Sequence, residues 1–115
     1  MSCYYNENSD NIEEILYLPI FKDIEIAFKE TLGYDIERLK IKSNTQVYVY
    51  PRIIFSYLCR RENISLRIIG KKIGKDHSSI SGYLAKYDAY YKNDKIFKLL
   101  ADAIINKYKE IKNGK

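Results

Sequence analysis

The chain has 115 residues, of which 46% are hydrophobic, so it is long enough for one compact domain and is not a disordered polymer. Its 20 basic and 15 acidic residues give a net charge of +5, and no stretch approaches the run of about 20 apolar residues that crosses a bilayer. One histidine and two distant cysteines, Cys3 and Cys59, cannot supply the roughly four ligands of a structural zinc. We therefore expect no metal, no cofactor and no membrane partner.

The charge is unevenly distributed along the chain. Residues 1–40 contain nine acidic and four basic side chains, whereas residues 41–115 contain six acidic and sixteen basic ones. A basic part joined to an acidic one is typical of a protein that binds a polyanion on one side, although a solvated lysine surface gives the same pattern. Residues 1–10 lack the basic and apolar regions of a signal peptide, so we expect a cytoplasmic protein.

The N-terminal part predicts little regular structure. Residues 11–18 fit a short helix with Asp10 as its N-cap, and Pro19 is expected to interrupt that helix. We therefore separate an N-terminal acidic and apolar segment, residues 1–22, from a domain that covers residues 23–112. The segment is expected to be partly disordered or to form one short helix.

Two helices are predicted at the start of the domain. Over residues 22–32 the apolar side chains recur at helical spacing, and Gly33 is well placed as a C-terminal cap. Asp35 can then cap a short helix over residues 36–40.

The next ten residues, 41–50, are the least helical stretch, because residues 47–50 favour extended backbone. Pro51 suits the first turn of a following helix, where a missing N–H costs nothing. We expect this helix to reach about Arg61. The side chains it buries should be Ile54, Phe55 and Leu58.

Residues 65–91 show the order helix, tight turn, helix. Ser65 begins the first helix, and Gly70 within it allows a partner helix to approach closely. Gly74 permits a sharp turn because it adopts a positive φ without strain. Asp76 is a strong N-cap for the second helix. This order predicts a helix-turn-helix.

The second helix of this pair has an unusual outward face. The side that must face the core, at 100° per residue, carries Ile80, Leu84, Tyr87 and Tyr91. The outward side then carries Ser78, Ser81, Gly82, Ala85 and Ala89. An ordinary exposed face would carry long charged side chains with high helix propensity. Side chains this short allow a partner to approach the helix backbone closely. The partner could be the DNA major groove, or it could be another helix, either in the same domain or in a dimer.

The last helix begins after Asn93 and Asp94. Its apolar stripe consists of Ile96, Leu99, Leu100, Ala103 and Ile104. Together these segments predict an all-α fold, a small helical bundle that contains a helix-turn-helix, with at most a short extended loop around residues 45–50.

Residues 24–111 resemble the C-terminal DNA-binding domain of the bacterial replication initiator DnaA. The strongest correspondence is Ser65-Leu66, followed by Ile69-Gly70 and then by residues 74–80, Gly-Lys-Asp-His-Ser-Ser-Ile. The family has Gly-Arg-Asp-His-Thr-Thr-Val at the last of these places. Pro51-Arg52 stands where the family has Arg-Pro-Arg. The ATPase module of the initiator is not among these 115 residues.

The resemblance implies a role for each matching position. In that family the Asp-His-Thr-Thr turn contacts bases in the major groove. The base-reading residues would therefore be Asp76, His77, Ser78 and Ser79. The serines lack the threonine methyl groups, and Lys75 replaces an arginine and keeps only a point charge for phosphate. The expected contacts to the DNA backbone, which fix register without reading sequence, are Arg52, Ser65, Lys71, Lys72, Lys75 and Lys86.

The loop before Pro51 departs from the family pattern. The family has several arginines there, one of which enters the minor groove, whereas residues 42–50 contain a single base, Lys42. Minor-groove reading by arginine is therefore absent or is replaced by Asn44 or Gln46, and the target sequence of the initiator does not transfer to this chain.

These features predict sequence-preferring binding of double-stranded DNA in replication initiation or transcription regulation, in the cytoplasm of a bacterium or as a phage protein in a bacterial host. The alternative is an adaptor that binds a replication or regulatory protein through the acidic residues 7–30. An enzyme is disfavoured, because His77 lacks an orienting acid and a nucleophile, and Asp76 is explained as a cap. The oligomeric state is not determined by the sequence.

Overall fold

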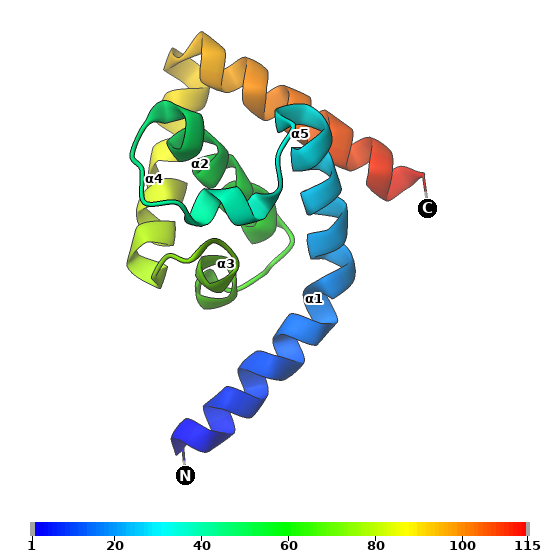
Figure 1. Ribbon diagram of the computed structural model, residues 1–115, viewed down its shortest axis with the longest axis vertical. Coiled ribbons are helices and arrows are strands. Elements are labelled where there is room, and N and C mark those ends of the chain that lie inside the picture. Colours follow the sequence, from blue (N-terminus) through cyan, green and yellow to red (C-terminus); the bar gives the residue numbers. More distant parts are fainter. Residues whose placement is uncertain (1, 115) are drawn as a thin grey trace.

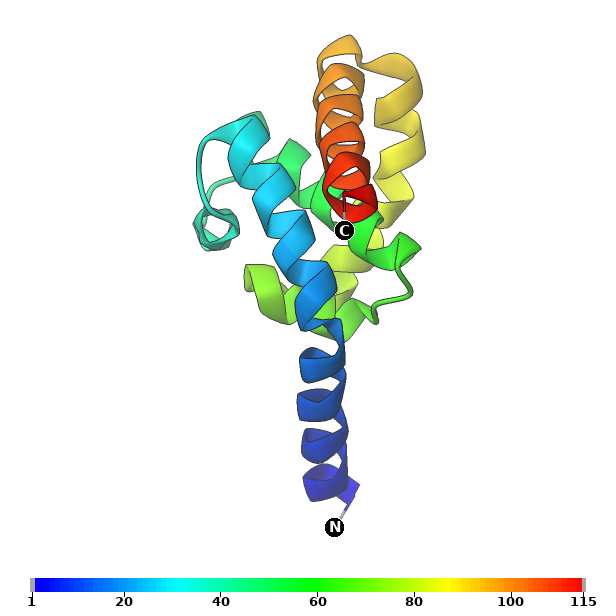
Figure 2. The same ribbon diagram turned by 90° about the vertical axis from the view of Figure 1, so that its right-hand side faces the viewer.

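A computed structural model describes the backbone of residues 2–114 and the side chains of Ile12 and residues 14–114. In this range the chain forms α1 (Ser2–Leu32), the 3-10 helix η1 (Ile36–Lys40), α2 (Gln46–Arg61), α3 (Leu66–Ile73), α4 (His77–Asn93) and α5 (Lys95–Asn113). The predicted all-α bundle is thus confirmed. Figure 1 shows the other helices arranged around α2, and Figure 2 shows the first half of α1 projecting from the body. None of the described helices is long and apolar enough to span a membrane.

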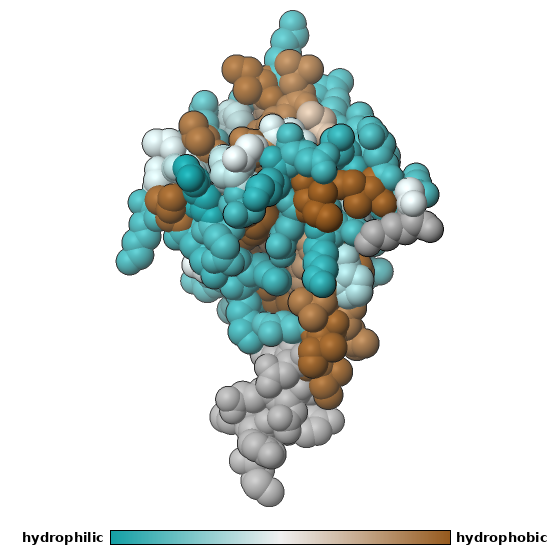
Figure 3. Space-filling view, turned by 45° about the vertical axis from the view of Figure 1, so that its right-hand side comes forward, coloured by the Kyte–Doolittle hydropathy of each residue, from teal (hydrophilic) through white to brown (hydrophobic). Residues whose placement is uncertain are grey.

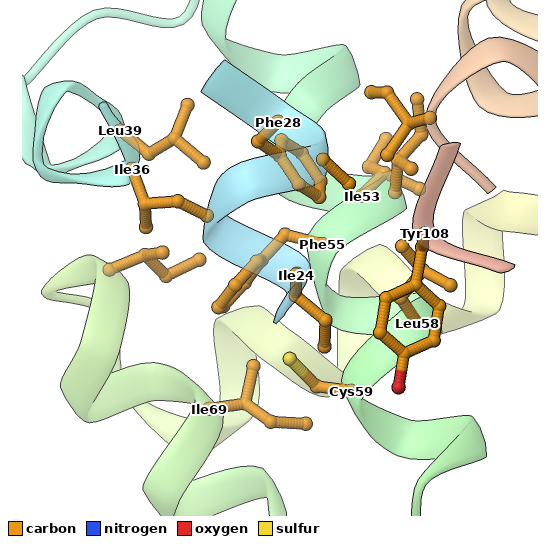
Figure 4. Close-up of a cluster of buried hydrophobic side chains, with 14 of the residues drawn as sticks. Ile24, Phe28, Ile36, Leu39, Ile53, Phe55, Leu58, Cys59, Ile69 and Tyr108 are labelled. Atoms are coloured by element: carbon orange, nitrogen blue, oxygen red, sulfur yellow. The ribbon is translucent and has the colours of Figure 1, made fainter. Parts of the chain in front are cut away.

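The core forms around α2, which contacts α1, α3, α4 and α5. The ring of Phe55 lies between those of Phe21 and Phe28 from α1, at centroid distances of 6.3 and 5.7 Å. Figure 4 shows Cys59 and Ile69 extending this cluster toward α3. The predicted burial of α2 is confirmed for Ile54, Phe55 and Leu58. Because most of α2 is buried, the positions of the surrounding helices are set by their packing against it.

Helix α1 continues through Pro19, where the sequence predicted an interruption. A proline inside a helix costs about 3 kcal/mol through a lost hydrogen bond and a steric clash. Directly after it, Phe21 and Ile24 are fully buried, and this packing outweighs the local cost. Figure 1 shows a bend between the projecting and the packed halves of α1, as expected at a proline. The predicted boundary at residue 22 falls inside this helix, and the side chains of residues 1–11 lie outside the described ones.

Helix α2 begins at Gln46, earlier than predicted, so that residues 47–50 are helical and Pro51 lies inside the helix. Pro51 has no N–H to offer the carbonyl oxygen of Val47, four residues earlier. The hydroxyl of Tyr34 donates to that oxygen instead, at 3.2 Å. The missing backbone bond is therefore replaced by a side chain that is distant in sequence.

The short predicted helix over residues 36–40 is confirmed as η1. Asp35 stands at its N-cap position with extended backbone but makes no side-chain capping hydrogen bond. Its carboxylate instead lies 3.3 Å from the ammonium of Lys29 at the end of α1. Gly33, which connects the two helices, has the positive φ of 84° that the sequence led us to expect.

Helix α5 buries a face that includes only Ile104 of the predicted stripe. Its buried residues are Phe97, Ala101, Ile104, Ile105 and Tyr108. Ile96 and Leu99 of the predicted stripe are 72% and 71% exposed. Both faces have apolar residues three and four apart, so spacing alone cannot choose between them. The aromatic side chains decide, because the ring of Phe97 packs edge-on against Tyr50 and Tyr87, at 5.2 and 5.5 Å.

Candidate nucleic-acid interface

The turn between α3 and α4 is built around two glycines. Gly74 ends α3 with a φ of 67°, as the sequence predicted. The amide of Lys75 donates to the carbonyl oxygen of Gly70 at 2.8 Å. A Cβ on Gly70 would collide with the carbonyl oxygen of Lys75. Gly70 is therefore required by the close return of the turn itself, and not by the approach of a partner helix.

Asp76 caps α4, and the exposed tip of the helix follows it. A carboxylate oxygen of Asp76 accepts a hydrogen bond from the amide of Ser79 at 2.8 Å. Hydrogen bonds from the backbone and the hydroxyl of Ser79 hold the pKa of Asp76 below its usual range, so the cap is ionised at neutral pH. Asp76, His77 and Ser78 are exposed, and Ser79 is half-buried. The four predicted base-reading residues thus lie together at one helix end.

The bare face of α4 is defined here as Ser78, Ser81, Gly82, Ala85 and Ala89. Gly82 is half-buried, and the other four residues are exposed. A Cβ on Gly82 would meet nothing within 4 Å. The opposite side of α4 faces the core as predicted, with Ile80 and Tyr87 buried and Leu84 and Tyr91 partly so. Among the described residues no helix of this domain covers the bare face, which removes one of the two alternatives to DNA.

Basic side chains border the tip of α4. The pKa of Lys75 is lowered by partial burial and by the nearby positive charges of Arg52 and Lys42, so Lys42 and Lys75 share one positive region. On α3, Arg67 lines a surface hollow together with Ser65 and His77. The sequence analysis did not assign Arg67 or Lys42 to the site. Arg67 could have been predicted as a surface residue of the site, because it lies in the first turn of α3 and is not one of the regularly spaced apolar residues that face the core.

Arg52 is a correction to the predicted site. Its side chain is 0% exposed, although we expected it to contact a phosphate. The guanidinium donates to the carbonyl oxygens of Leu39 at 2.9 Å, of Ser43 at 2.6 Å and of Ile41. Three carbonyl groups satisfy this buried cation: that of Leu39 belongs to η1, and those of Ile41 and Ser43 belong to the loop between η1 and α2. Arg52 therefore shapes that loop from within the protein and is not available to DNA.

Lys71 and Lys72 lie against α1. The ammonium of Lys71 is 2.8 Å from a carboxylate oxygen of Glu14, and that of Lys72 is 3.7 Å from Glu25. Lys72 also lies 4.8 Å over the ring of Phe21. Carboxylates of α1 thus neutralise two of the lysines that the sequence assigned to phosphate contacts. Lys86, by contrast, is exposed on α4.

The loop between η1 and α2 presents polar side chains. Asn44 and Gln46 are both exposed, and Gln46 is the first residue of α2. The loop also carries Lys42, which is exposed close to Lys75. The predicted substitutes for a minor-groove arginine are therefore on the surface, in the loop that Arg52 shapes from beneath.

Two helices joined by a tight glycine turn, with the second helix capped and exposed at its tip, define a helix-turn-helix protein. The chain belongs to the family of the bacterial DnaA protein helix-turn-helix, whose sequence profile matches residues 21–86. The match includes the packed half of α1, the turn and the tip of α4. It confirms the resemblance found in the sequence and points to DNA binding. Searches of curated proteins and of solved structures gave no match to the chain.

Proposed function

We propose that the protein binds double-stranded DNA with sequence preference, by placing the first turn of α4 in the major groove. The observation that carries the proposal is the open bare face of α4, on which Gly82 has no neighbour within 4 Å of a Cβ position, in a chain of the DnaA helix-turn-helix family. The major groove is about 12 Å wide and admits a helix whose outward side chains are short. Replication initiation and transcription regulation are both compatible with this activity.

Base reading is assigned to the four residues at the tip of α4. His77 donates to a base acceptor or packs on a thymine methyl group, and the Ser78 hydroxyl reaches a base edge. Asp76 caps the helix through one oxygen and keeps lone pairs for a cytosine or adenine amino group. Ser79, which bonds to Asp76, positions that carboxylate and adds its own hydroxyl.

Contacts to the DNA backbone are assigned to side chains around the tip. From the predicted set we retain Ser65, Lys75 and Lys86, and we add Lys42 and Arg67. These groups attract phosphates without distinguishing bases. Lys71 and Lys72 would join them only after release from the carboxylates of α1. Residues 23–112 remain the proposed extent of the DNA-binding domain.

The first experiment selects bound sequences from a random duplex pool and then measures variants on the preferred site and on random DNA. His77→Ala should cost about 1–3 kcal/mol on the preferred site and blunt the preference. Lys86→Ala should weaken binding to all sequences alike and reduce the salt slope by about one unit. Lys109→Ala, an exposed lysine near the end of α5, serves as the matched control and should change neither. Equal losses on both DNAs for His77→Ala would remove the base-reading role.

The adaptor alternative receives no support from the arrangement of α1. Among the described acids of this helix, Glu14, Glu25 and Glu30 each pair with a lysine of the same chain, at 2.8, 3.7 and 3.2 Å. These carboxylates are partly used within the protein, so the acidic stretch is not simply a free surface for a basic partner. We therefore give DNA binding as the single proposed function.

A further inference from the structure

Two apolar surfaces of the described residues are left without a partner. The first lies on the projecting half of α1, where Ile12, Ile15 and Leu16 are 58%, 64% and 67% exposed. We call these residues the α1 stripe. Spacings of three and four residues place them on one side of the helix. Figure 3 shows apolar side chains gathered on this part of α1, next to the grey residues.

The second surface is a hollow of about 350 Å³ where α1 ends and where α2 and α5 begin. We call it the α5 groove, and the side chains that define it are Leu32, Tyr34, Val47, Tyr50, Ile96 and Leu100. Its rim is unusually apolar, since Val47 and Ile96 are 63% and 72% exposed, and Leu99 beside them is 71% exposed. Single exposed apolar residues are common, but a concave cluster of them indicates a binding surface.

The α1 stripe cannot reach the α5 groove of its own molecule. Leu32 lines the groove and Ile12 belongs to the stripe, and both are residues of the same helix. The twenty residues between them span about 30 Å at the rise of an α-helix. Figure 1 shows the start of α1 at one end of the molecule and the start of α5 at the other. Only the groove of another molecule is therefore accessible to the stripe.

We propose that the α1 stripe of one copy of this protein binds in the α5 groove of a second copy. An amphipathic helix that lays its apolar face into an apolar groove is a recurrent mode of recognition. This interaction goes beyond DNA binding and requires no DNA. Both complementary surfaces are present in every molecule, so the partner that fits is a second copy of the chain.

Electrostatics favours this pairing over the pairing of two α1 helices. Residues 1–21 contain acidic side chains but neither lysine nor arginine, so two α1 helices side by side repel each other. Two cations adjoin residues of the groove: Lys95 directly precedes Ile96, and Arg38 lies 5.4 Å over the ring of Tyr34. Two helix N-termini, those of α2 and α5, add partial positive charge at the same place.

The acids nearest the groove oppose an acidic helix only weakly, because they are already engaged. Asp35 pairs with Lys29 at 3.3 Å. Asp94 accepts a hydrogen bond from the Tyr50 hydroxyl. It also accepts one from the amide of Phe97, at 3.0 Å. The first half of α1 and the α5 groove are therefore complementary in charge as well as in apolarity.

The geometry makes the assembly open. Stripe and groove are different surfaces at opposite ends of the molecule, so each contact leaves one free stripe and one free groove. A reciprocal two-fold dimer would set two acidic α1 helices side by side, where they repel each other, so the copies add head to tail instead. One helix in one groove is a small interface, and we expect a dissociation constant on the order of 10–100 μM.

Sedimentation velocity of the full chain without DNA tests the proposal at protein concentrations from about 1 μM to 1 mM. The weight-average mass should rise with concentration, pass that of a dimer and fall when salt is added, since salt screens the charge attraction. A protein that is monomeric over this whole range overturns the proposal. A mass that stops at a dimer, or one that rises with salt, indicates pairing through another surface and also overturns it.

Two variants separate the surfaces and make the test specific. Ile12→Asn with Leu16→Asn alters only the stripe, and Val47→Asn with Ile96→Asn alters only the groove. All four positions are exposed, so folding should be retained, as a circular dichroism melt can verify. Each variant alone should be monomeric, with at least about a tenfold weaker association. Mixed in equal amounts, they should form one-to-one heterodimers and nothing larger, because one intact stripe meets one intact groove. Self-association of the groove variant alone would show an α1–α1 contact and refute the assignment.

Discussion

Arg52 and Tyr34 make hydrogen bonds to backbone carbonyl groups from the end of η1 to the first turn of α2, including those of the loop between them. The guanidinium of Arg52 gathers the carbonyl oxygens of Leu39, Ile41 and Ser43, and the Tyr34 hydroxyl bonds the carbonyl that Pro51 leaves without a donor. Both side chains thus satisfy backbone groups that no regular element satisfies. The loop carries the candidate minor-groove residues, so these internal contacts determine where such residues stand.

At the scale of this residue, we predict that Arg52→Ala lowers the free energy of unfolding by about 3 kcal/mol or more, because it empties a buried site and leaves carbonyl groups unpaired. Arg52→Lys should recover only part of the loss, since one ammonium cannot reach three carbonyls in the geometry of a guanidinium. Urea denaturation measures both. Arg61→Ala, an exposed arginine of the same helix, is the control. A cost below about 0.5 kcal/mol for Arg52→Ala would contradict the structural role.

At the scale of the elements, α4 and α5 show two uses of an exposed helix face. The bare face of α4 carries only short side chains, and two of its residues, Ser81 and Gly82, lower the helix propensity. Such a face suits the close approach of a DNA groove to the helix backbone. The exposed face of α5 is instead large and apolar at Ile96 and Leu99, which suits the burial of a partner's apolar residues. The same fold thus offers one surface for nucleic acid and another for protein.

The two helical glycines should respond in opposite ways to the same substitution. Gly82→Ala adds a methyl group in open space, so it should stabilise the protein by about 1 kcal/mol through helix propensity. Gly70→Ala places a methyl group against the carbonyl oxygen of Lys75, so it should destabilise by about 1–3 kcal/mol. Thermal and urea denaturation of the two variants give the comparison. Equal signs would mean that the turn after α3 is looser than described.

At the scale of the whole molecule, carboxylates join elements that are distant in sequence. Asp94 caps α5 at the end of α4 and accepts from the Tyr50 hydroxyl of α2. Glu62, after α2, accepts from the Tyr108 hydroxyl at 2.5 Å and pairs with Lys112 at 3.0 Å, both on α5. Ion pairs between α1 and the lysines of α3 and α5 add weaker, salt-sensitive contacts. Part of the charge asymmetry of the chain therefore stabilises the packing of its acidic N-terminal part against its basic C-terminal part.

These carboxylates predict loss of stability in acid. The Tyr50 hydroxyl and the amide of Phe97 lower the pKa of Asp94. Burial acts to raise the pKa of Glu62, but the bonds from Tyr108 and Lys112 prevail and lower it. A carboxyl with a lowered folded-state pKa stabilises the protein above its unfolded pKa of about 4, and the contribution disappears as the pH falls through the folded value. Urea midpoints should therefore decrease from pH 6 toward about pH 2.

Two further measurements isolate the contribution of Asp94. Asp94→Asn should be less stable at neutral pH and should lose less than the parent protein on acidification. In alkali the sign reverses, because the hydrogen bond to Asp94 and burial raise the pKa of Tyr50 to about 12. Tyr50 thus contributes stability below its unfolded pKa of about 10 that is lost as the pH rises through the folded value. An identical acid profile for Asp94→Asn and the parent would contradict the first expectation.

Features that depend on a few neighbouring residues were predictable from the amino-acid sequence alone. The cap at Asp76, the turn at Gly74 and the orientation of α4 were all predictable, because capping, positive φ and helical spacing are properties of short segments. The exposed tip of the candidate site follows from these three features. The base-reading role of this tip is inferred only from the resemblance to the DnaA family. Membership in that family is confirmed by the match over residues 21–86.

Features that depend on distant partners became visible only in the folded molecule. The continuity of α1 at Pro19, the replacement of a backbone bond by Tyr34 and the burial of Arg52 each rest on residues elsewhere in the chain. The predicted face of α5 was largely wrong, because two apolar faces have the same spacing and only the packing of Phe97 selects between them. The physical reason is the same in each case. Whether a polar group is satisfied or an apolar face is covered is a property of the packed molecule, and local propensity carries no information about it.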